Sequence, residues 1–158
     1  MSLKADRKIF VYETNYVTEA AVEAGRLLTV KSGLNTGLGS GQGIRDQAGI
    51  AVQWTGAPNA SHKVIGVSLA IATGLDQTKF SKEVFARDVQ IVGEPHPIGK
   101  DGYVWTDAIV GEPRPEDPAY LGTNGAFDTT QNASLPAVGK FKTSKDQDGY
   151  AKVYVKLA

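Results

Sequence analysis

The sequence predicts an all-β fold, a small barrel or sandwich of short antiparallel strands with an extended N-terminal arm. Short β-prone segments recur at intervals of roughly 10 to 20 residues, with turn signals between them. No long segment shows the apolar period of an amphipathic helix. Residues 150–157 alternate between polar and apolar, which is typical of a half-buried strand. We expect residues 1–25 to form the arm and residues 26–158 to form the β-domain.

The arm contains the first β-prone segment, residues 9–12, which has β-forming residues on both faces. Such a segment suits a strand that adds to the sheet edge of another chain. Pairing within its own domain explains the same pattern equally well, so both possibilities stay open. Residues 18–25 then predict either a short helix or a loop.

Strands are expected next at residues 26–30, 50–54 and 63–72. In the last of these, small residues alternate with large apolar ones, so a neighbouring strand should approach the small face closely. The glycine-rich segment 31–49 predicts a loop rather than a phosphate site, because neither a lysine nor a helical pattern follows its glycines. Residues 79–91 are compatible with a short helix or with two strands.

The C-terminal third predicts strands joined by tight turns. Asn124 and Gly125 form the pair that best tolerates positive φ at both central positions of a hairpin turn. Residues 146–149 predict a second turn. In the closing strand, four apolar residues share one face, and the opposite face carries Tyr150, Lys152, Tyr154 and Lys156.

Composition excludes several classes of function. Lysine plus arginine equals aspartate plus glutamate, 17 each, which argues against nucleic-acid binding by bulk phosphate attraction and permits close self-association. The chain has no cysteine, which excludes disulfides, zinc–thiolate sites and cysteine nucleophiles. No apolar run is long enough to predict a membrane span or a signal segment.

The sequence shows no pattern typical of a catalytic or metal site. His62 and His96 are the only histidines, and neither belongs to a metal-ligand spacing. We expect His96, between Pro95 and Pro97, to lie on a solvated rim. The carboxylates are scattered along the chain. The sequence therefore predicts a protein that is not an enzyme and that uses no catalytic residue, metal or cofactor.

Aromatic residues suggest two kinds of surface. Trp54, Trp105 and Tyr103 could form a carbohydrate-binding platform, or they could cover strand faces as core residues do. Tyr150 and Tyr154 share the closing strand's lysine-bearing face with Lys152 and Lys156, so we expect these four residues to form an interface.

The chain resembles the head decoration proteins, or capsid cement, of tailed bacteriophages. Three parts of the strand and glycine pattern carry this resemblance: residues 25–30, residues 48–52 with 64–68, and residues 138–141 with 148–153. The resemblance implies a homotrimer on the outer surface of the virion capsid, where it stabilises contacts between major capsid protein subunits after the shell expands. It also implies a capsid-binding arm, whose residues here would be Ile9, Phe10, Val11, Tyr12 and Tyr16.

Two alternatives remain at this stage. One is a carbohydrate-binding or adhesin β-sandwich domain of a virion, which would use the aromatic platform. The other is a hydrolase built on the scattered carboxylates, although two facing carboxylates cannot be established from sequence.

Overall fold

Strands make up nearly all the regular structure of the described chain. The computed structural model describes residues 8–13, 16–18, 20–30, 49–69, 71–73, 89–91 and 96–157. Its N-terminal strands are β1 (Lys8–Glu13), β2 (Tyr16–Thr18), β3 (Leu27–Val30), β4 (Gly49–Val52), β5 (Val64–Ser68), β6 (Ile71–Thr73) and β7 (Val89–Ile91). The C-terminal elements are β8 (Ile98–Thr106), β9 (Ile109–Val110), β10 (Pro118–Leu121), the 3-10 turn η2 (Thr123–Gly125), β11 (Phe127–Asp128), β12 (Gly139–Phe141) and β13 (Ala151–Lys156).

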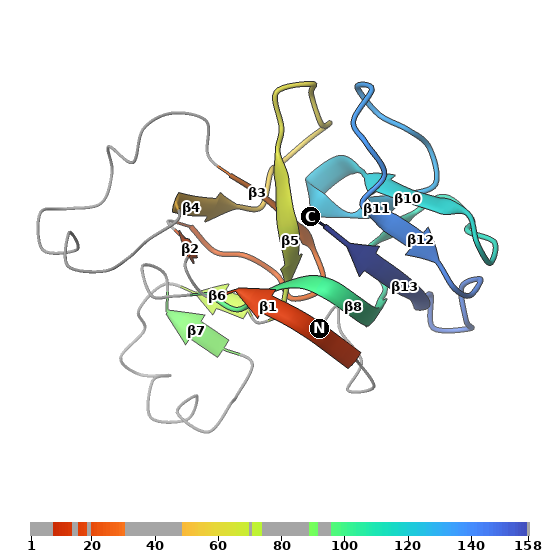
Figure 1. Ribbon diagram of the computed structural model, residues 1–158, viewed down its shortest axis with the longest axis horizontal. Coiled ribbons are helices and arrows are strands. Elements are labelled where there is room, and N and C mark those ends of the chain that lie inside the picture. Colours follow the sequence, from red (N-terminus) through yellow and green to blue (C-terminus); the bar gives the residue numbers. More distant parts are fainter. Residues whose placement is uncertain are drawn as a thin grey trace, which may run out of the picture.

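All described strands except β6 and β7 form one curled sheet, a half-barrel, which confirms the all-β prediction (Figure 1). Its order is β2-β4-β3-β5-β8-β13-β12-β10-β11-β9, and β1 pairs with β8 off this path. The pairs β2–β4 and β11–β9 are parallel, and the other neighbours in this sheet are antiparallel. Strands β6 and β7 form a separate parallel pair. In the part of the chain that is described, no helix is long and apolar enough to cross a membrane.

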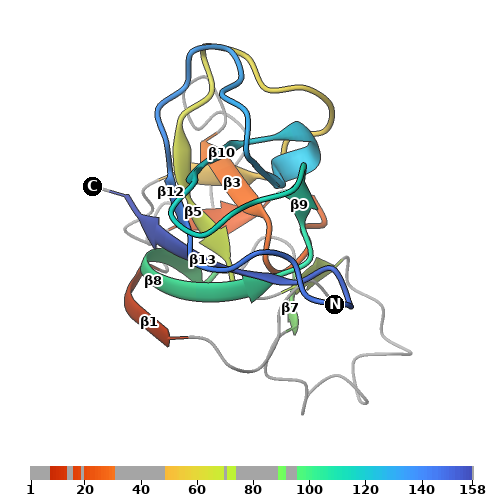
Figure 2. The ribbon, with the colours of Figure 1, turned by 90° about the vertical axis from the view of Figure 1, so that its right-hand side faces the viewer.

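Strand β8 pairs with three strands along its two edges. Gly99 lies opposite both Val67 of β5 and Tyr12 of β1, whereas Gly102 lies opposite both Val155 of β13 and Ile9 of β1. Because each edge of a strand holds one partner at a given position, β1 occupies one edge, and β5 and β13 share the other. Figure 2 shows β1 on the side of β8 away from β13.

The change of partner along β8 coincides with a bulge. The register of β1 against β8 shifts twice, on either side of the Val11–Asp101 pair. An irregularity of this kind bends a strand and increases its local twist. The bend falls where β8 passes from β5 to β13, so it lets the two halves of the sheet diverge and curl.

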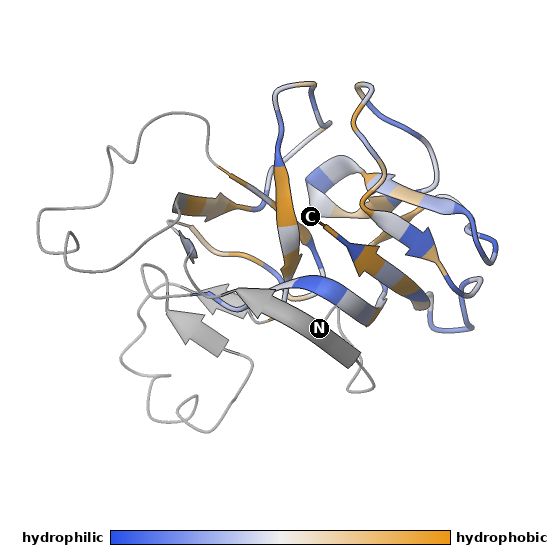
Figure 3. Cartoon of the chain, in the orientation of Figure 1, coloured by the Kyte–Doolittle hydropathy of each residue, from blue (hydrophilic) through white to orange (hydrophobic). Residues whose placement is uncertain are grey.

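The core consists of two clusters that meet at β3 and β8. Leu27 and Val104 belong to the larger cluster, and Leu28 and Ile98 belong to the smaller one. All four side chains are fully buried. Figure 3 shows apolar residues concentrated along β5 and β13, which lie next to β8. The halves of the sheet are therefore joined by packing as well as by backbone pairing.

Two glycines allow close approach of neighbouring strands, and the sequence predicts this for the first of them. A Cβ at Gly66 would lie 2.6 Å from the Gly99 carbonyl oxygen of β8. A Cβ at Gly139 in β12 would overlap the Tyr154 carbonyl oxygen and lie 2.9 Å from the Tyr154 carbonyl carbon in β13. Both backbones are too close for any other residue to fit without displacing a strand.

The predicted turns of the C-terminal third are present. Asn124 and Gly125 have φ of 56° and 73°, and Ala126 N–H donates to the Thr123 carbonyl at 3.1 Å. In the second turn, the Asp146 carboxylate accepts backbone hydrogen bonds from Asp148 and Tyr150. These turns fix the register of the strands on either side.

We predict that Gly139→Ala lowers the free energy of unfolding by about 2 kcal/mol or more, because the new Cβ must push β12 away from β13. Urea and thermal denaturation measure this loss. Gly149→Ala is the matched control, since its Cβ meets nothing within 4 Å and only the positive φ of 85° opposes it, at about 1 kcal/mol. Equal losses for the two variants would contradict the proposed clash.

Candidate partner-binding face

The most distinctive surface is the outer side of β8, β13 and β12. In β8, Val104 is buried while its neighbours Tyr103 and Trp105 are half-buried. In β13, Val153 and Val155 are buried, as the sequence predicts, and the alternate residues face out. We call this surface the outer face and define it by the residues Asp101, Tyr103, Trp105, Glu116, Lys140, Lys142, Lys152, Tyr154 and Lys156.

Strand register brings these residues into rows. Lys152 lies opposite Trp105, and Lys156 lies opposite Asp101. Tyr154 lies between Tyr103 of β8 and Lys140 of β12. Residues directly opposite one another in antiparallel strands have their side chains on the same side of the sheet. The rows therefore place aromatic rings and lysines side by side.

The two tyrosines form the centre of the outer face. The ring centroids of Tyr103 and Tyr154 are 5.0 Å apart, with an interplanar angle of 37°. The Lys152 ammonium lies over the Tyr103 ring, 4.9 Å from its centroid, within the range of a cation–π interaction. Partial desolvation is the main cause that raises the pKa of Tyr154, and a hydrogen bond to Asp101 is the second cause. The Tyr154 hydroxyl therefore stays protonated at neutral pH.

Glu116 lies next to two lysines of the outer face. Its carboxylate forms an ion pair with Lys142, and its other oxygen lies 3.7 Å from the Lys140 ammonium. The hydrogen bond from Lys142 is the main cause that lowers the pKa of Glu116, and the same bond raises the pKa of Lys142. Both groups are charged at neutral pH.

The backbone of Glu116 is strained. Its φ is 73°, in the left-handed region that non-glycine residues seldom adopt. Its N–H donates to the Phe141 carbonyl at 2.7 Å, which anchors the loop to β12. Strain of this kind persists only where the surrounding contacts impose it, and it concentrates at functional sites.

Charge is concentrated on the outer face. Four lysines stand against two carboxylates, a net charge of +2, although the whole chain has a net charge of zero. Lys140 is exposed, with 58% of its side-chain surface accessible, and Lys142 is at 29%. The outer face can therefore attract a negatively charged partner at short range.

The structure brings together most of the predicted interface. Lys152, Tyr154 and Lys156 lie on the outer face, and Tyr150 lies just before them in the turn that enters β13. Sequence reasoning missed Lys140, Lys142 and Glu116 as members of this surface. The alternation around Phe141 was the signal for the two lysines, whereas only the fold places Glu116 beside them.

The predicted arm residues lie against their own chain. Ile9, Phe10, Val11 and Tyr12 belong to β1, which pairs with β8. Tyr16 begins β2, and its carbonyl accepts a hydrogen bond from His96 N–H at 2.9 Å. The sequence left two possibilities open, and in the structure β1 pairs with a strand of its own domain. Strand donation to a second chain stays the alternative.

His96 is not on a solvated rim, so that expectation is wrong. The residue is fully buried, because Leu69 N–H bonds the Pro97 carbonyl and draws this segment against β5. His96 Nε2 lies 2.7 Å from Ser68 Oγ. The spacing would suit a nucleophile and its base, but both side chains are 0% exposed, so substrate has no access. The pair is a buried polar link.

The third aromatic residue of the proposed platform belongs to a different segment. Trp54 follows β4, its ring lies 4.3 Å from the His62 ring, and its Nε1–H donates to the Ala57 carbonyl. Tyr103 and Trp105, by contrast, occupy alternate positions of β8. Register therefore unites only two of the three aromatic residues.

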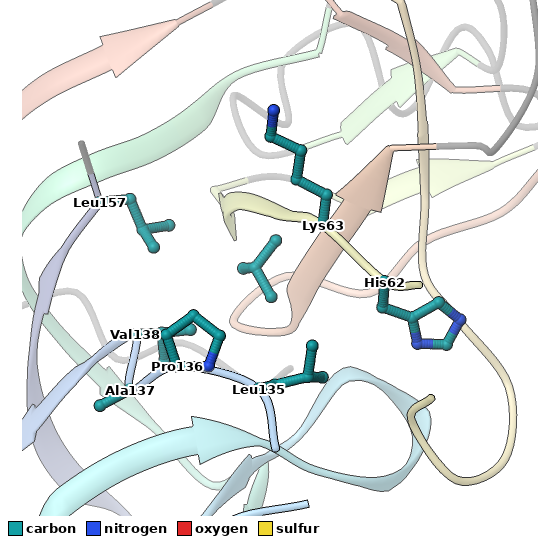
Figure 4. Close-up of a pocket in the computed structure, with 8 residues that line it drawn as sticks. His62, Lys63, Leu135, Pro136, Ala137, Val138 and Leu157 are labelled. Atoms are coloured by element: carbon teal, nitrogen blue, oxygen red, sulfur yellow. The ribbon is translucent and has the colours of Figure 1, made fainter. Parts of the chain in front are cut away.

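An apolar cavity of about 150 Å³ lies beside the end of the chain. Figure 4 shows Leu135, Pro136 and Val138 on one side of it and Leu157 on another. Among the described residues that line it, His62 and Lys63 alone are charged or titratable. The lining offers no set of converging polar groups for catalysis. Among the described residues, no group of three His, Asp or Glu side chains could hold a metal ion.

Comparison with known proteins finds neither a matching family model nor a matching curated protein.

We predict that His96 makes the protein acid-sensitive. Burial lowers its pKa to about 4, whereas the unfolded chain titrates near 6.5, so protonation favours unfolding. The contribution of neutral His96 to the free energy of unfolding is complete above pH 6.5, and about 3 kcal/mol of it is lost as the pH drops to 4. Urea unfolding of the wild type and of His96→Gln across this range isolates the effect. Parallel pH profiles for the two proteins would contradict it.

Proposed function

We propose that this chain is a non-enzymatic capsid decoration protein. It binds the outer surface of the expanded head of a tailed bacteriophage and stabilises contacts between major capsid protein subunits. The observation that carries the proposal is the outer face, where ordered lysines and aromatic rings lie on a rigid sheet. A surface of this kind suits a protein partner better than a small substrate.

The curled sheet suits a protein that resists force. Strand β8 is paired on both edges, and its core side chains are fully buried, so the outer face rests on a support that deforms little. A homotrimer would present three such faces at once. Linked contacts gain affinity by effective concentration without any new interaction. Modest contacts at each face would then suffice to hold the protein on the virion surface.

The alternative is a carbohydrate-binding or adhesin domain of a virion. The shared position of Tyr103 and Trp105 on the outer face favours it, because sugar rings stack on aromatic side chains. Lys152 covers one side of the Tyr103 ring, however, and Tyr154 packs beside it. These contacts leave less ring surface for stacking, so we rank this function second.

We predict that the protein co-sediments with expanded heads that lack their decoration protein. The double variant Lys152→Glu/Lys156→Glu should weaken this binding about 10-fold or more, because it reverses two charges at the contact. Lys156→Glu alone should also weaken binding, and Lys63→Glu is its matched control, since it makes the same charge change at an exposed position outside the outer face. Circular dichroism and thermal melting establish that each variant is folded.

Two outcomes would decide against the decoration function. No co-sedimentation of the wild-type protein at micromolar concentration would exclude it. Glycan-array binding that Trp105→Ala abolishes would favour the carbohydrate-binding alternative.

We predict that β1 stays on β8 when the protein binds a capsid. Val11 and Asp101 are Cα partners in these antiparallel strands. Directly opposite residues of such a pair have Cα atoms about 4.5 to 5.5 Å apart, which a disulfide can span. The double variant Val11→Cys/Asp101→Cys, in a chain with no other cysteine, locks β1 to β8 when oxidised. Oxidised and reduced forms should co-sediment equally. Loss of binding on oxidation, restored by reduction, would show instead that β1 is donated to the capsid.

A further inference from the structure

We infer that the lysines of the outer face bind carboxylates of an extended acidic segment of the partner protein, and that Glu116 stands in for one of those carboxylates in the free protein. This inference rests on the proposed function and names the chemistry of its partner. It concerns the four lysines Lys140, Lys142, Lys152 and Lys156.

The lysines are spaced like the side chains of a strand. Lys140 lies in β12 and Lys142 lies just past its end, two positions away, and Lys152 lies two positions from Tyr154 in β13. Alternate residues of a strand are about 7 Å apart on one face, and adjacent strands are about 4.8 Å apart. An extended segment with Asp or Glu at every second position repeats its carboxylates at the same interval. It can therefore meet successive lysines without distortion.

Three of the four lysines are also held in position before any partner arrives. The Tyr103 ring holds Lys152, and the Glu116 carboxylate holds Lys142 and Lys140. Ordering a free lysine side chain costs conformational entropy, and much of that cost is already met on this surface. Lysines on an ordinary solvated surface lack such partners.

Glu116 occupies the place that a partner's carboxylate would take. Its own carboxylate lies between two lysines, on a side chain that is 60% exposed. Its left-handed backbone directs it there at a conformational cost. An incoming carboxylate must compete with it for Lys140 and Lys142, so Glu116 weakens binding and limits it to segments with several acidic groups.

Two other polyanions fit the outer face less well. Asp101 and Glu116 lie within it, and the chain has no net charge to attract a phosphate backbone from a distance. The Tyr103 ring is covered by Lys152, which reduces stacking by bases or sugars. An acidic protein segment needs neither long-range attraction nor a free ring.

Binding of a labelled peptide with alternating Glu and Thr, measured by fluorescence anisotropy at low salt, tests the inference. Glu116→Gln should bind the peptide about 3-fold more tightly than the wild type, because it removes the competing carboxylate. Lys140→Gln/Lys142→Gln should bind at least about 10-fold more weakly. Glu112→Gln is the matched control, because Glu112 pairs with Lys145 outside the outer face. A peptide of alternating Lys and Thr tests the charge requirement.

Unchanged or weaker binding by folded Glu116→Gln would overturn the inference, as would tighter binding of single-stranded DNA or heparin than of the acidic peptide. The capsid assay separates the two proposals. If Glu116→Gln and the lysine variants co-sediment with heads as the wild type does, the decoration function is supported and the inferred acidic partner segment is contradicted. If the variants bind the peptide as expected but the wild type does not bind capsids, the lysines bind an acidic segment and the decoration function is contradicted.

Discussion

The pairing of β8 with three strands is the constraint on which the rest of the structure depends. One edge of β8 is covered by β1, and the other is divided between β5 and β13. The bulge between Gly99 and Asp101 makes this division possible, because it bends the strand where its partner changes. Without that bend, the two halves of the sheet would compete for one edge, and neither core cluster would close.

The outer face follows from the same constraint. Because β13 pairs with the second half of β8, Tyr154 is opposite Tyr103 and Lys152 is opposite Trp105. Gly139 then brings β12 close enough to place Lys140 opposite Tyr154. A slip of one residue in any of these pairs would turn the lysines into the core and the valines outward. Core packing therefore fixes the arrangement of charges that a partner would meet.

The local sequence pattern was sufficient to predict the closing strand and a turn, but it was insufficient to predict the positions of His96 and Glu116. The alternation of residues 151–156 and the Asn124-Gly125 pair predicted a half-buried strand and a hairpin turn, because a strand's period and a turn's φ are properties of neighbouring residues. The burial of His96 depends on β5, which is distant in sequence. The position of Glu116 depends on β12 in the same way. The positions of His96 and Glu116 depend on strand pairing between segments that are distant in the chain, and the local pattern of a single sequence does not show which strands pair.

His96 and Glu116 have opposite roles in this molecule. His96 Nε2 is hydrogen-bonded to Ser68 Oγ inside the sheet, and burial lowers the pKa of the histidine, so His96 limits the pH range of stability. Glu116 is held in a strained conformation at the surface, where it can be replaced by another carboxylate. Glycine at position 116 would adopt this φ without strain, but it would place no carboxylate beside Lys140 and Lys142. The strain at Glu116 therefore accompanies a charge that a partner can replace, which makes Glu116 the residue that best tests the binding chemistry of the outer face.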